Sequence, residues 1–324
     1  MPHIDQAGSR VVSNSKPTDK AHVEPTGHRV VHRELLTPGS IDDSGGLGPG
    51  VVGHELGGTQ SVSMEIEPFV VPLESKDFAV GDEVIGYLDI DVVVLAGGLG
   101  TRIRDILGDT PKLLAPIGGH AFLDILIARL RNFGARRLIL GLGHLAGKVT
   151  AHLENNSPAD IDIVTAVEPE PLGTAGALRF VIPEINTDPV LVMNGDSFTG
   201  ADLCVFADAH RQSGTDASIL CAEVLDTAAY GRVNISTEGW MLAFAEKSLD
   251  ISGPGVINAG VYLFNAAMLD TIKDMQGPSL ERDVFQALAP GTIHGVTSDA
   301  PFIDIGMPGD LARAEGVLAP FSPA

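Results

Sequence analysis

The residues with the clearest capacity for chemistry are a run of glycines and the cations that follow it. Gly97-Gly98-Leu99-Gly100-Thr101-Arg102 comes directly after the short apolar run 92–96, and Lys112 follows soon afterwards. Glycines let backbone N–H groups approach an anion closely, while Arg102 and Lys112 add fixed positive charge. A buried strand, a glycine turn and two cations in this order predict a cradle for the phosphates of a nucleotide.

Two other phosphate-binding loops do not match this stretch. A P-loop needs a lysine and a serine or threonine directly after its last glycine, but Thr101 and Arg102 follow Gly100. A dinucleotide fingerprint needs a third glycine where Ile103 stands, and an acidic residue after the next strand, where 141–143 reads Gly-Leu-Gly. A nicotinamide-dependent oxidoreductase is therefore disfavoured, and a glycine turn that merely closes a βα unit stays open as the structural alternative.

The elements that must position these residues alternate between apolar strands and amphipathic helices from about residue 90 onward. This pattern is typical of a mostly parallel sheet with helices on its faces. The expected strands are 92–96, 137–142, 161–167, 190–193 and 217–224, with helices at 122–133, 145–153, 174–182 and 202–213. Gly134 stands where a glycine commonly ends a helix.

The rhythm changes after residue 224. Three apolar stretches at 230–235, 240–245 and 257–264 predict a β meander inserted beside the sheet. Helices are expected near 266–274 and 280–289, a late strand at 302–306 and a last helix at 308–317. The predicted fold class is therefore α/β: a Rossmann-like, mostly parallel mixed sheet flanked by helices, with an inserted meander.

Three acidic residues follow predicted strands. Glu168, Asp196 and Asp304 each come at or after the end of an apolar run. Ligands of open α/β sheets bind beyond the carboxyl ends of the strands, so we expect these side chains to face the glycine loop. Asp196 and Asp304 are candidate Mg²⁺ ligands, because Mg²⁺ prefers oxygen ligands. A turn role for Asp196 and a helix-capping role for Asp304 are the plainer alternatives.

Composition limits the classes of partner. The 324 residues include 42 acidic and 21 basic side chains, a net charge of −21 that argues against a nucleic-acid or anionic-membrane partner. Cys204 and Cys221 are the two cysteines, which suits free thiols in a reducing cytoplasm. The start of the chain has no signal-peptide pattern, and no apolar run reaches the ~18 residues of a membrane span.

Six ordered motifs between about 90 and 318 resemble those of the sugar-1-phosphate nucleotidyltransferases. They are Gly-Gly-x-Gly-Thr-Arg at 97–102 with Pro-Lys at 111–112, Glu-Pro-x-Pro-Leu-Gly-Thr-Ala at 168–175, Asn-Gly-Asp at 194–196, Glu-Lys at 246–247, Asn-Ala-Gly-Val-Tyr at 258–262 and Phe-Ile-Asp-Ile-Gly-x-Pro at 302–308. This resemblance implies transfer of a nucleoside monophosphate from a nucleoside triphosphate to a sugar 1-phosphate, with release of pyrophosphate and dependence on Mg²⁺.

The resemblance also implies a role for each matching residue. Arg102 and Lys112 would be catalytic cations, with Asp196 and Asp304 as metal ligands. The implied nucleotide-binding residues are Leu95, Ala96, Gly97, Gly98, Gly100, Thr101, Glu168, Gly173 and Thr174. The implied sugar-phosphate-binding residues are Asn194, Gly231, Glu246, Lys247, Asn258 and Gly260.

Glu168, which the resemblance places in the segment that reads the base, indicates which nucleotide is bound. An ionised carboxylate only accepts hydrogen bonds, and guanine offers two adjacent donors, whereas uracil and thymine offer one donor flanked by acceptors. GTP is therefore the favoured nucleotide. Among guanylyl enzymes, two stretches, the run at 253–258 and the compact ending at 302–308, resemble those of bacterial D-glycero-D-manno-heptose-1-phosphate guanylyltransferases. Mannose-1-phosphate guanylyltransferases and other hexose-1-phosphate enzymes are the alternative, and a non-catalytic nucleotide-sugar-binding regulatory module is the alternative of another class.

The chain divides into three predicted parts. Residues 1–60 are rich in Gly, Pro, Ser, His and charge and are expected to be a flexible, low-complexity extension. Residues 61–89 suggest short strands whose role the sequence does not indicate. Residues 90–324 form the predicted nucleotidyltransferase domain, for which a homo-oligomer stays open.

Overall fold

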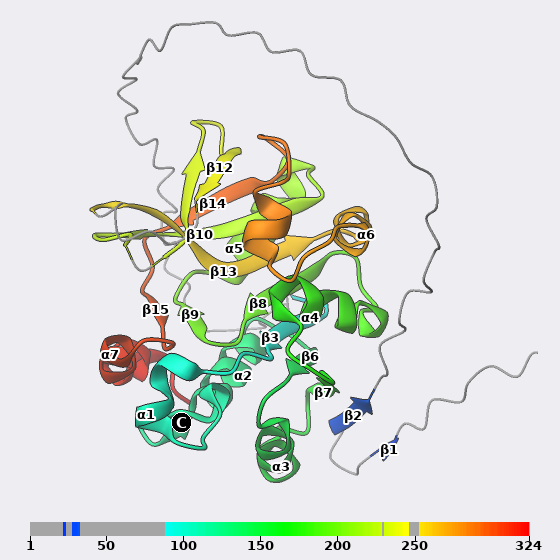
Figure 1. The fold of residues 1–324 in the computed structure, drawn as a ribbon, viewed down its shortest axis with the longest axis vertical. Helices are drawn as coiled ribbons and strands as arrows, with labels where there is room; N and C mark the ends of the chain where they lie inside the picture. Colours follow the sequence, from blue (N-terminus) through cyan, green and yellow to red (C-terminus); the bar gives the residue numbers. More distant parts are fainter. Residues whose placement is uncertain (1–21, 24–27, 33–87, 229, 246–252, 324) are drawn as a thin grey trace, which may run out of the picture.

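A large mixed sheet forms the centre of the molecule. The computed structural model describes residues 22–23, 28–32, 88–228, 230–245 and 253–323. Within them the main sheet has the order β1-β2-β7-β6-β3-β8-β13-β10-β14, and β11 and β12 extend it from β13 (Figure 1). Strands β2, β7, β6, β3 and β8 are mutually parallel, whereas β13 runs antiparallel to β8 and to β10.

The elements have the following bounds. The main-sheet strands are β1 His22–Val23, β2 His28–His32, β3 Val92–Ala96, β6 Arg137–Leu142, β7 Asp162–Val167, β8 Val190–Asn194, β10 Ala217–Val224, β11 Arg232–Ile235, β12 Met241–Ala245, β13 Gly255–Phe264 and β14 His294–Ser298. Two small sheets pair β4 Pro116–Ile117 with β5 His120–Ala121, and β9 Ser197–Thr199 with β15 Phe302–Asp304. The helices are α1 Arg104–Leu107, α2 Phe122–Asn132, α3 Ala146–Asn156, α4 Gly173–Val181, α5 Leu203–Ser213, α6 Ala266–Asp274 and α7 Pro308–Leu318, with a π-helix, η4, at Leu280–Phe285 and 3-10 turns η1 Thr101–Ile103, η2 Lys112–Leu114, η3 Ile182–Glu184 and η5 Ala319–Phe321.

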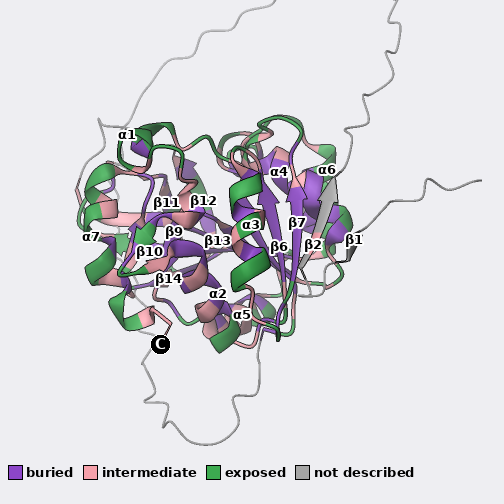
Figure 2. Cartoon of the chain, turned by 90° about the horizontal axis from the view of Figure 1, so that it is seen from below, coloured by how far each residue is buried: buried purple, intermediate pink, exposed green. Residues whose placement is uncertain are grey.

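Alternate residues of the central strands belong to two hydrophobic cores, one on each face of the sheet, because successive side chains of a strand point to opposite faces. Val92 and Val94 of β3 pack with helices α2, α3, α5 and α7. Val93 and Leu95 pack on the other face with α4, α6 and η4. Burial of both faces explains why these strands read as continuous apolar runs (Figure 2).

The predicted fold class is confirmed. The strand at 137–142 has the predicted bounds, and α2 ends before Gly134, whose φ of 89° is the left-handed conformation expected of a helix-ending glycine. Two local details differ. The segment expected to be a helix at 280–289 begins as the π-helix 280–285, and the last strand of the predicted meander, β13, also lies inside the main sheet between β8 and β10.

The prediction of a structureless extension over residues 1–60 is wrong for residues 28–32. These residues form β2, which adds to the main sheet parallel to β7 and places His28 opposite Ile163 and His32 opposite Val167. The run is short, and its residues do not alternate between apolar and polar. Its strand conformation therefore depends on pairing with the edge of β7, which lies far along the chain. Residues 22–23 form β1, which pairs with β2. The rest of the predicted extension, and 61–87 of the next segment, lie outside the described residues.

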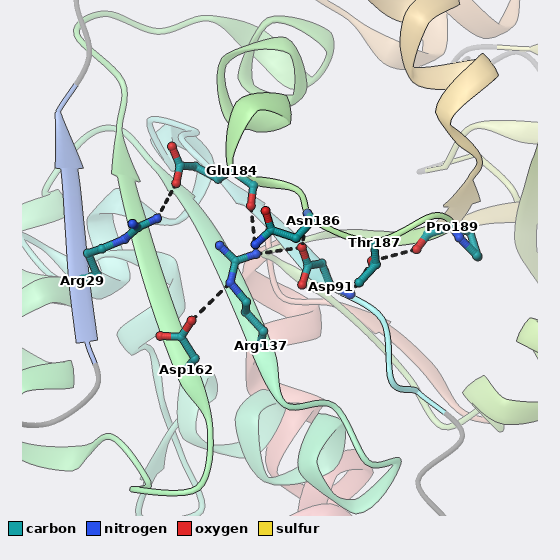
Figure 3. A network of polar contacts seen from close by, with 8 residues as sticks. All are labelled: Arg29, Asp91, Arg137, Asp162, Glu184, Asn186, Thr187 and Pro189. Carbon is teal, nitrogen blue, oxygen red and sulfur yellow. Dashed lines mark hydrogen bonds and ion pairs between the residues drawn. The ribbon is translucent and has the colours of Figure 1, made fainter. Parts of the chain in front are cut away.

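An ion-pair network ties β2 to the rest of the sheet (Figure 3). Arg29 on β2 donates to Glu184 at 2.6 Å. Arg137 on β6 donates to Asp91 at 2.7 Å, to the Glu184 carbonyl at 2.8 Å and to Asp162 at 3.2 Å. Because Asp91 and Glu184 are 3% and 7% exposed, these partners satisfy carboxylates that burial would otherwise destabilise. The network lies at the amino ends of β3, β6 and β7, away from the candidate site.

None of the helices in the described residues is both long and apolar enough to span a membrane.

Candidate active site

The glycine loop follows the carboxyl end of β3. Gly100 has φ 61° and ψ 25°, a left-handed conformation that glycine adopts without a side-chain clash. The stem of Lys112 passes close to this glycine, since a β-carbon at position 100 would lie 3.5 Å from its Cγ and Cε. The segment after β8 is tied to the end of β3 by Gly195, whose N–H donates to the Leu95 carbonyl at 2.8 Å.

Three charged groups converge beside this loop. Lys112 Nζ lies 2.7 Å from Asp196 Oδ2. A β-carbon placed at Gly306 would lie 2.8 Å from Asp304 Oδ1, 3.1 Å from Lys112 Nζ and 3.5 Å from Asp196 Oδ2. The ammonium and both carboxylates therefore surround one point, and only the absence of a side chain at Gly306 leaves that point open.

The small sheet β9–β15 brings the two aspartates together. Asp304 ends β15 and pairs with Ser197, the residue after Asp196. The Ile305 N–H donates to the Asp196 carbonyl at 2.9 Å, and the Gly306 N–H donates to Asp304 Oδ1 at 2.7 Å. Strand pairing thus fixes the backbones of both aspartates, and a backbone hydrogen bond orients the Asp304 side chain.

The donor set fits a hard divalent cation. Mg²⁺ takes oxygen ligands and is commonly held by one or two carboxylates together with substrate phosphates. Asp196 and Asp304 supply two carboxylates directed at one point, with the Asp196 side chain 34% exposed. Among the described residues, no three His, Cys, Asp or Glu side chains gather into a metal-binding group.

A cavity of about 440 Å³ opens over these groups. It brings together most of the residues that the sequence motifs singled out. Those that line it are Leu95, Ala96, Gly97, Gly98, Gly100, Arg102, Lys112, Gly173, Thr174, Asn194, Asp196, Gly231, Asn258 and Asp304. Arg102 is exposed in this structure, whereas Lys112 is half-buried and paired.

Three predicted site residues are placed differently, and two are not described. Thr101, Glu168 and Gly260 do not line the cavity, and Glu246 and Lys247 lie outside the described residues. Gly260 is buried on β13 behind the cavity lining. Its φ is 71°, and a β-carbon there would lie 2.8 Å from Asn194 Nδ2. This glycine therefore allows the cavity-lining Asn194 to lie against β13.

Glu168 lies directly under the glycine loop. A β-carbon at Gly97 would come within 2.2 Å of Glu168 Oε1, so Gly97 is required for the carboxylate to lie there. Oε2 accepts from the Leu172 N–H at 3.2 Å, but Oε1 is buried without a partner. Burial raises the pKa of Glu168, and the Leu172 hydrogen bond partly opposes that rise. A buried carboxylate oxygen without a donor is an energetically costly arrangement.

Sequence reasoning missed several residues that line the cavity, among them Tyr230, Glu281 and Gly306. Tyr230 donates to Asp310 over 3.4 Å, and burial together with Asp310 and Asp304 raises its pKa to about 12. Its position directly before Gly231 was an available signal. Glu281 gave a weaker signal, since it lies on a segment that the pattern described simply as a helix.

The fold is that of an α/β protein with a glycine loop at the end of a parallel strand, beside a cavity that a lysine and two carboxylates line, an arrangement typical of phosphate-binding sites. Residues 91–315 match the family described as "Nucleotidyl transferase". The chain belongs to this family, as the sequence motifs predicted.

Similar proteins carry more specific names. A mannose-1-phosphate guanylyltransferase of Mycobacterium tuberculosis is 35% identical over 232 residues, which cover 71% of this chain and 64% of that protein. A D-glycero-alpha-D-manno-heptose 1-phosphate guanylyltransferase of Aneurinibacillus thermoaerophilus is 30% identical over 230 residues, which cover 71% of this chain and 98% of that protein. The chain thus spans under two thirds of the mycobacterial relative but nearly all of the heptose relative.

Solved structures agree on the fold. HddC from Yersinia pseudotuberculosis is 32% identical with a TM-score of 0.63, and the match covers 70% of this chain and 98% of that one. A second structure of that protein, complexed with GMP-PN, gives the same values.

Proposed function

We propose that this chain, through residues 90–324, transfers GMP from GTP to a sugar 1-phosphate and releases pyrophosphate. The observation that carries this proposal is the convergence of Lys112, Asp196 and Asp304 on the point beside Gly306, next to the glycine loop. Such a site can neutralise a triphosphate and its developing charge, which nucleotidyl transfer requires.

The reaction needs no nucleophile from the protein. An oxygen of the sugar phosphate forms a new bond to the α-phosphorus, the bond from that phosphorus to the bridging oxygen breaks, and the electron pair leaves with pyrophosphate. Lys112 and Arg102 stabilise the negative charge that accumulates on the transferring group. Backbone N–H groups of the glycine loop orient the triphosphate so that attack and departure lie in line.

Asp196 and Asp304 would hold a divalent cation, for which we propose Mg²⁺. Such a cation, when bound, supplies Lewis-acid polarisation of the phosphate oxygens. Asp196 would then be shared between Lys112 and the cation, so the ammonium and the cation would neutralise the same carboxylates. Lys247 and Glu246 remain proposed sugar-phosphate residues on the strength of their motif.

The proposed base is guanine. Glu168 carries a buried carboxylate oxygen without a donor, and the named relatives are guanylyltransferases. For the sugar we propose D-glycero-D-manno-heptose 1-phosphate, because this chain and the heptose relative match over 98% of that relative's length. Mannose 1-phosphate is the second candidate, favoured by the higher identity to the mycobacterial relative. The two free thiols, Cys204 and Cys221, support a cytoplasmic location.

A matrix of substrates tests the proposal. GTP, UTP and ATP are each incubated with heptose, mannose and glucose 1-phosphates, with Mg²⁺ or with a chelator, and pyrophosphate release is recorded. We expect the highest kcat/KM for GTP with the heptose phosphate, and loss of turnover with the chelator. A protein that binds GTP but releases no pyrophosphate with any sugar phosphate would instead support the regulatory module.

A further inference from the structure

A carboxylate to which the family motifs assign no role lines the same cavity. Glu281 lines the cavity together with Thr174 and Asn258. It belongs to η4, a π-helix, and this irregular helix type is frequent at functional sites. In the proposed function, Thr174 lies at the nucleotide end and Asn258 at the sugar end.

Glu281 fixes the nucleotide end through two hydroxyls. Its Oε2 accepts from Thr174 Oγ1 at 3.0 Å and from Ser279 Oγ at 2.9 Å. The Thr174 oxygen also accepts from the Leu280 N–H at 2.8 Å, so this side chain is held as both donor and acceptor. One rotamer of Thr174 is thereby selected at the start of α4.

The backbone around these side chains is equally constrained. The Ala175 N–H donates to the Pro278 carbonyl at 2.8 Å. Gly173 has φ 71°, and a β-carbon there would lie 2.5 Å from the same carbonyl. The first turn of α4 and the segment 278–281 therefore form one unit, and Glu281 is its charged member.

The same carboxylate lies near the sugar end. Tyr262, fully buried on β13, has its pKa raised well above the usual value by burial and by the nearby Glu281 charge. Its hydroxyl accepts from Asn258 Nδ2 at 2.8 Å, while Asn258 Oδ1 accepts from the Gly260 N–H at 2.8 Å. The Asn258 amide is thus held at both of its polar atoms, and the Tyr262 hydroxyl that holds one of them feels the charge of Glu281.

We propose that Glu281 is a positioning residue that orients Thr174 toward the nucleotide and, through Tyr262, orients Asn258 toward the sugar. The identities of the two ligands rest on the proposed function. One carboxylate then orients side chains in both halves of the cavity, so its removal disturbs the binding of both substrates. Loss of the Thr174 hydroxyl affects only the nucleotide, and loss of the Tyr262 hydroxyl affects only the sugar phosphate.

Three variants separate this role from a general structural one. Glu281→Gln is expected to raise KM about ten-fold for both GTP and the sugar phosphate, since a hydrogen bond to a charged group contributes about that factor. Thr174→Val is expected to raise KM for GTP alone, and Tyr262→Phe to raise KM for the sugar phosphate alone. Glu154→Gln, an exposed carboxylate on α3, is the matched control and should leave every constant unchanged.

The inference is overturned if Glu281→Gln leaves both KM values within two-fold of the wild type, or lowers only kcat and Tm. Because substitution at Glu281 could affect folding, Tm is measured for each variant, and the split between Thr174→Val and Tyr262→Phe tests the link independently. Absence of turnover in the wild type would contradict the proposed function alone. In that case the Kd of GTP decides: equal affinity in wild type, Glu281→Gln and Thr174→Val would overturn the inference.

Discussion

Substitution of Gly306 by alanine inserts one methyl group at the centre of the charged cluster. The added carbon would lie 2.8 Å from Asp304 Oδ1 and 3.1 Å from Lys112 Nζ, closer than carbon approaches such atoms without repulsion. Gly306 does not have a positive φ, so the alanine backbone itself introduces no strain. The substitution therefore perturbs the site and little else.

The size of the effect follows from these distances. Asp304 must move by roughly 0.5 Å to restore normal contact with the methyl group. That movement weakens its hydrogen bond from the Gly306 N–H, now 2.7 Å long. Misplacement of a reacting group on this scale can lower the rate about 100-fold, or ~2.7 kcal/mol. The substitution should cost ~1–2 kcal/mol in the free energy of unfolding. Alanine also lowers the conformational entropy of the unfolded chain, which offsets ~0.5–1 kcal/mol of this cost.

Pyrophosphate release and thermal unfolding are measured in parallel. We expect Gly306→Ala to lose about 100-fold in kcat/KM, with a fall in Tm of less than about 5 °C. Gly309→Ala is the matched control, because no atom lies within 4 Å of a β-carbon at that position in α7. A folded Gly306→Ala protein with kcat/KM within two-fold of the wild type would refute the assignment of this cluster as the reacting centre.

Two further substitutions test the base and the sheet edge. Glu168→Gln should lower the GTP-to-UTP ratio of kcat/KM about ten-fold, because a carboxylate hydrogen bond is lost; an unchanged ratio would contradict base recognition by Glu168. Burial raises the pKa of Glu168 above its ordinary 4.5, so the folded state binds this proton more tightly than the unfolded state. The cost of the buried charge is fully present above the raised pKa and disappears as the pH falls toward 4.5. Denaturant titrations should therefore find Glu168→Gln more stable than the wild type at neutral pH, with the difference narrowing on acidification. Arg29→Ala removes the guanidinium that pairs with the buried Glu184 carboxylate, so it should lower the free energy of unfolding by ~1–3 kcal/mol; an unchanged Tm would show that this ion pair does not stabilise the fold.

Local sequence was enough to predict which residues gather at the glycine-loop side of the cavity. The glycine loop follows β3 within one continuous stretch, and Gly173 and Thr174 begin a helix whose apolar spacing is visible in the sequence. Asp196 follows the end of β8 after one intervening residue, Gly195. Parallel strands end at one edge of their sheet, so residues that follow such strands must gather there wherever they lie in the chain.

Contacts between distant segments could not be read in the same way. Gly306 is part of the motif at 302–308, but sequence reasoning assigned it no role; its importance arises because β15 pairs with β9 and brings Asp304 to the Asp196–Lys112 pair. Glu281 lies in a segment with ordinary helical composition, and only its packing on the start of α4 turns it toward the cavity. The strand at 28–32 has no strand pattern in its own sequence, and it forms because its partner, β7, supplies its hydrogen bonds.

From about residue 90 onward, the sequence by itself determined the alternation of strands and helices, the glycine loop and the edge of the sheet where the acidic residues collect, because these depend on periodicity and on residues that are neighbours in the chain. Tertiary structure alone decided that Asp196 and Asp304 face one point, that Glu168 lies beneath Gly97, and that β2 covers the edge of β7. Each of these depends on register and packing between segments far apart in the chain, and short-range patterns of hydrophobicity do not encode such distances.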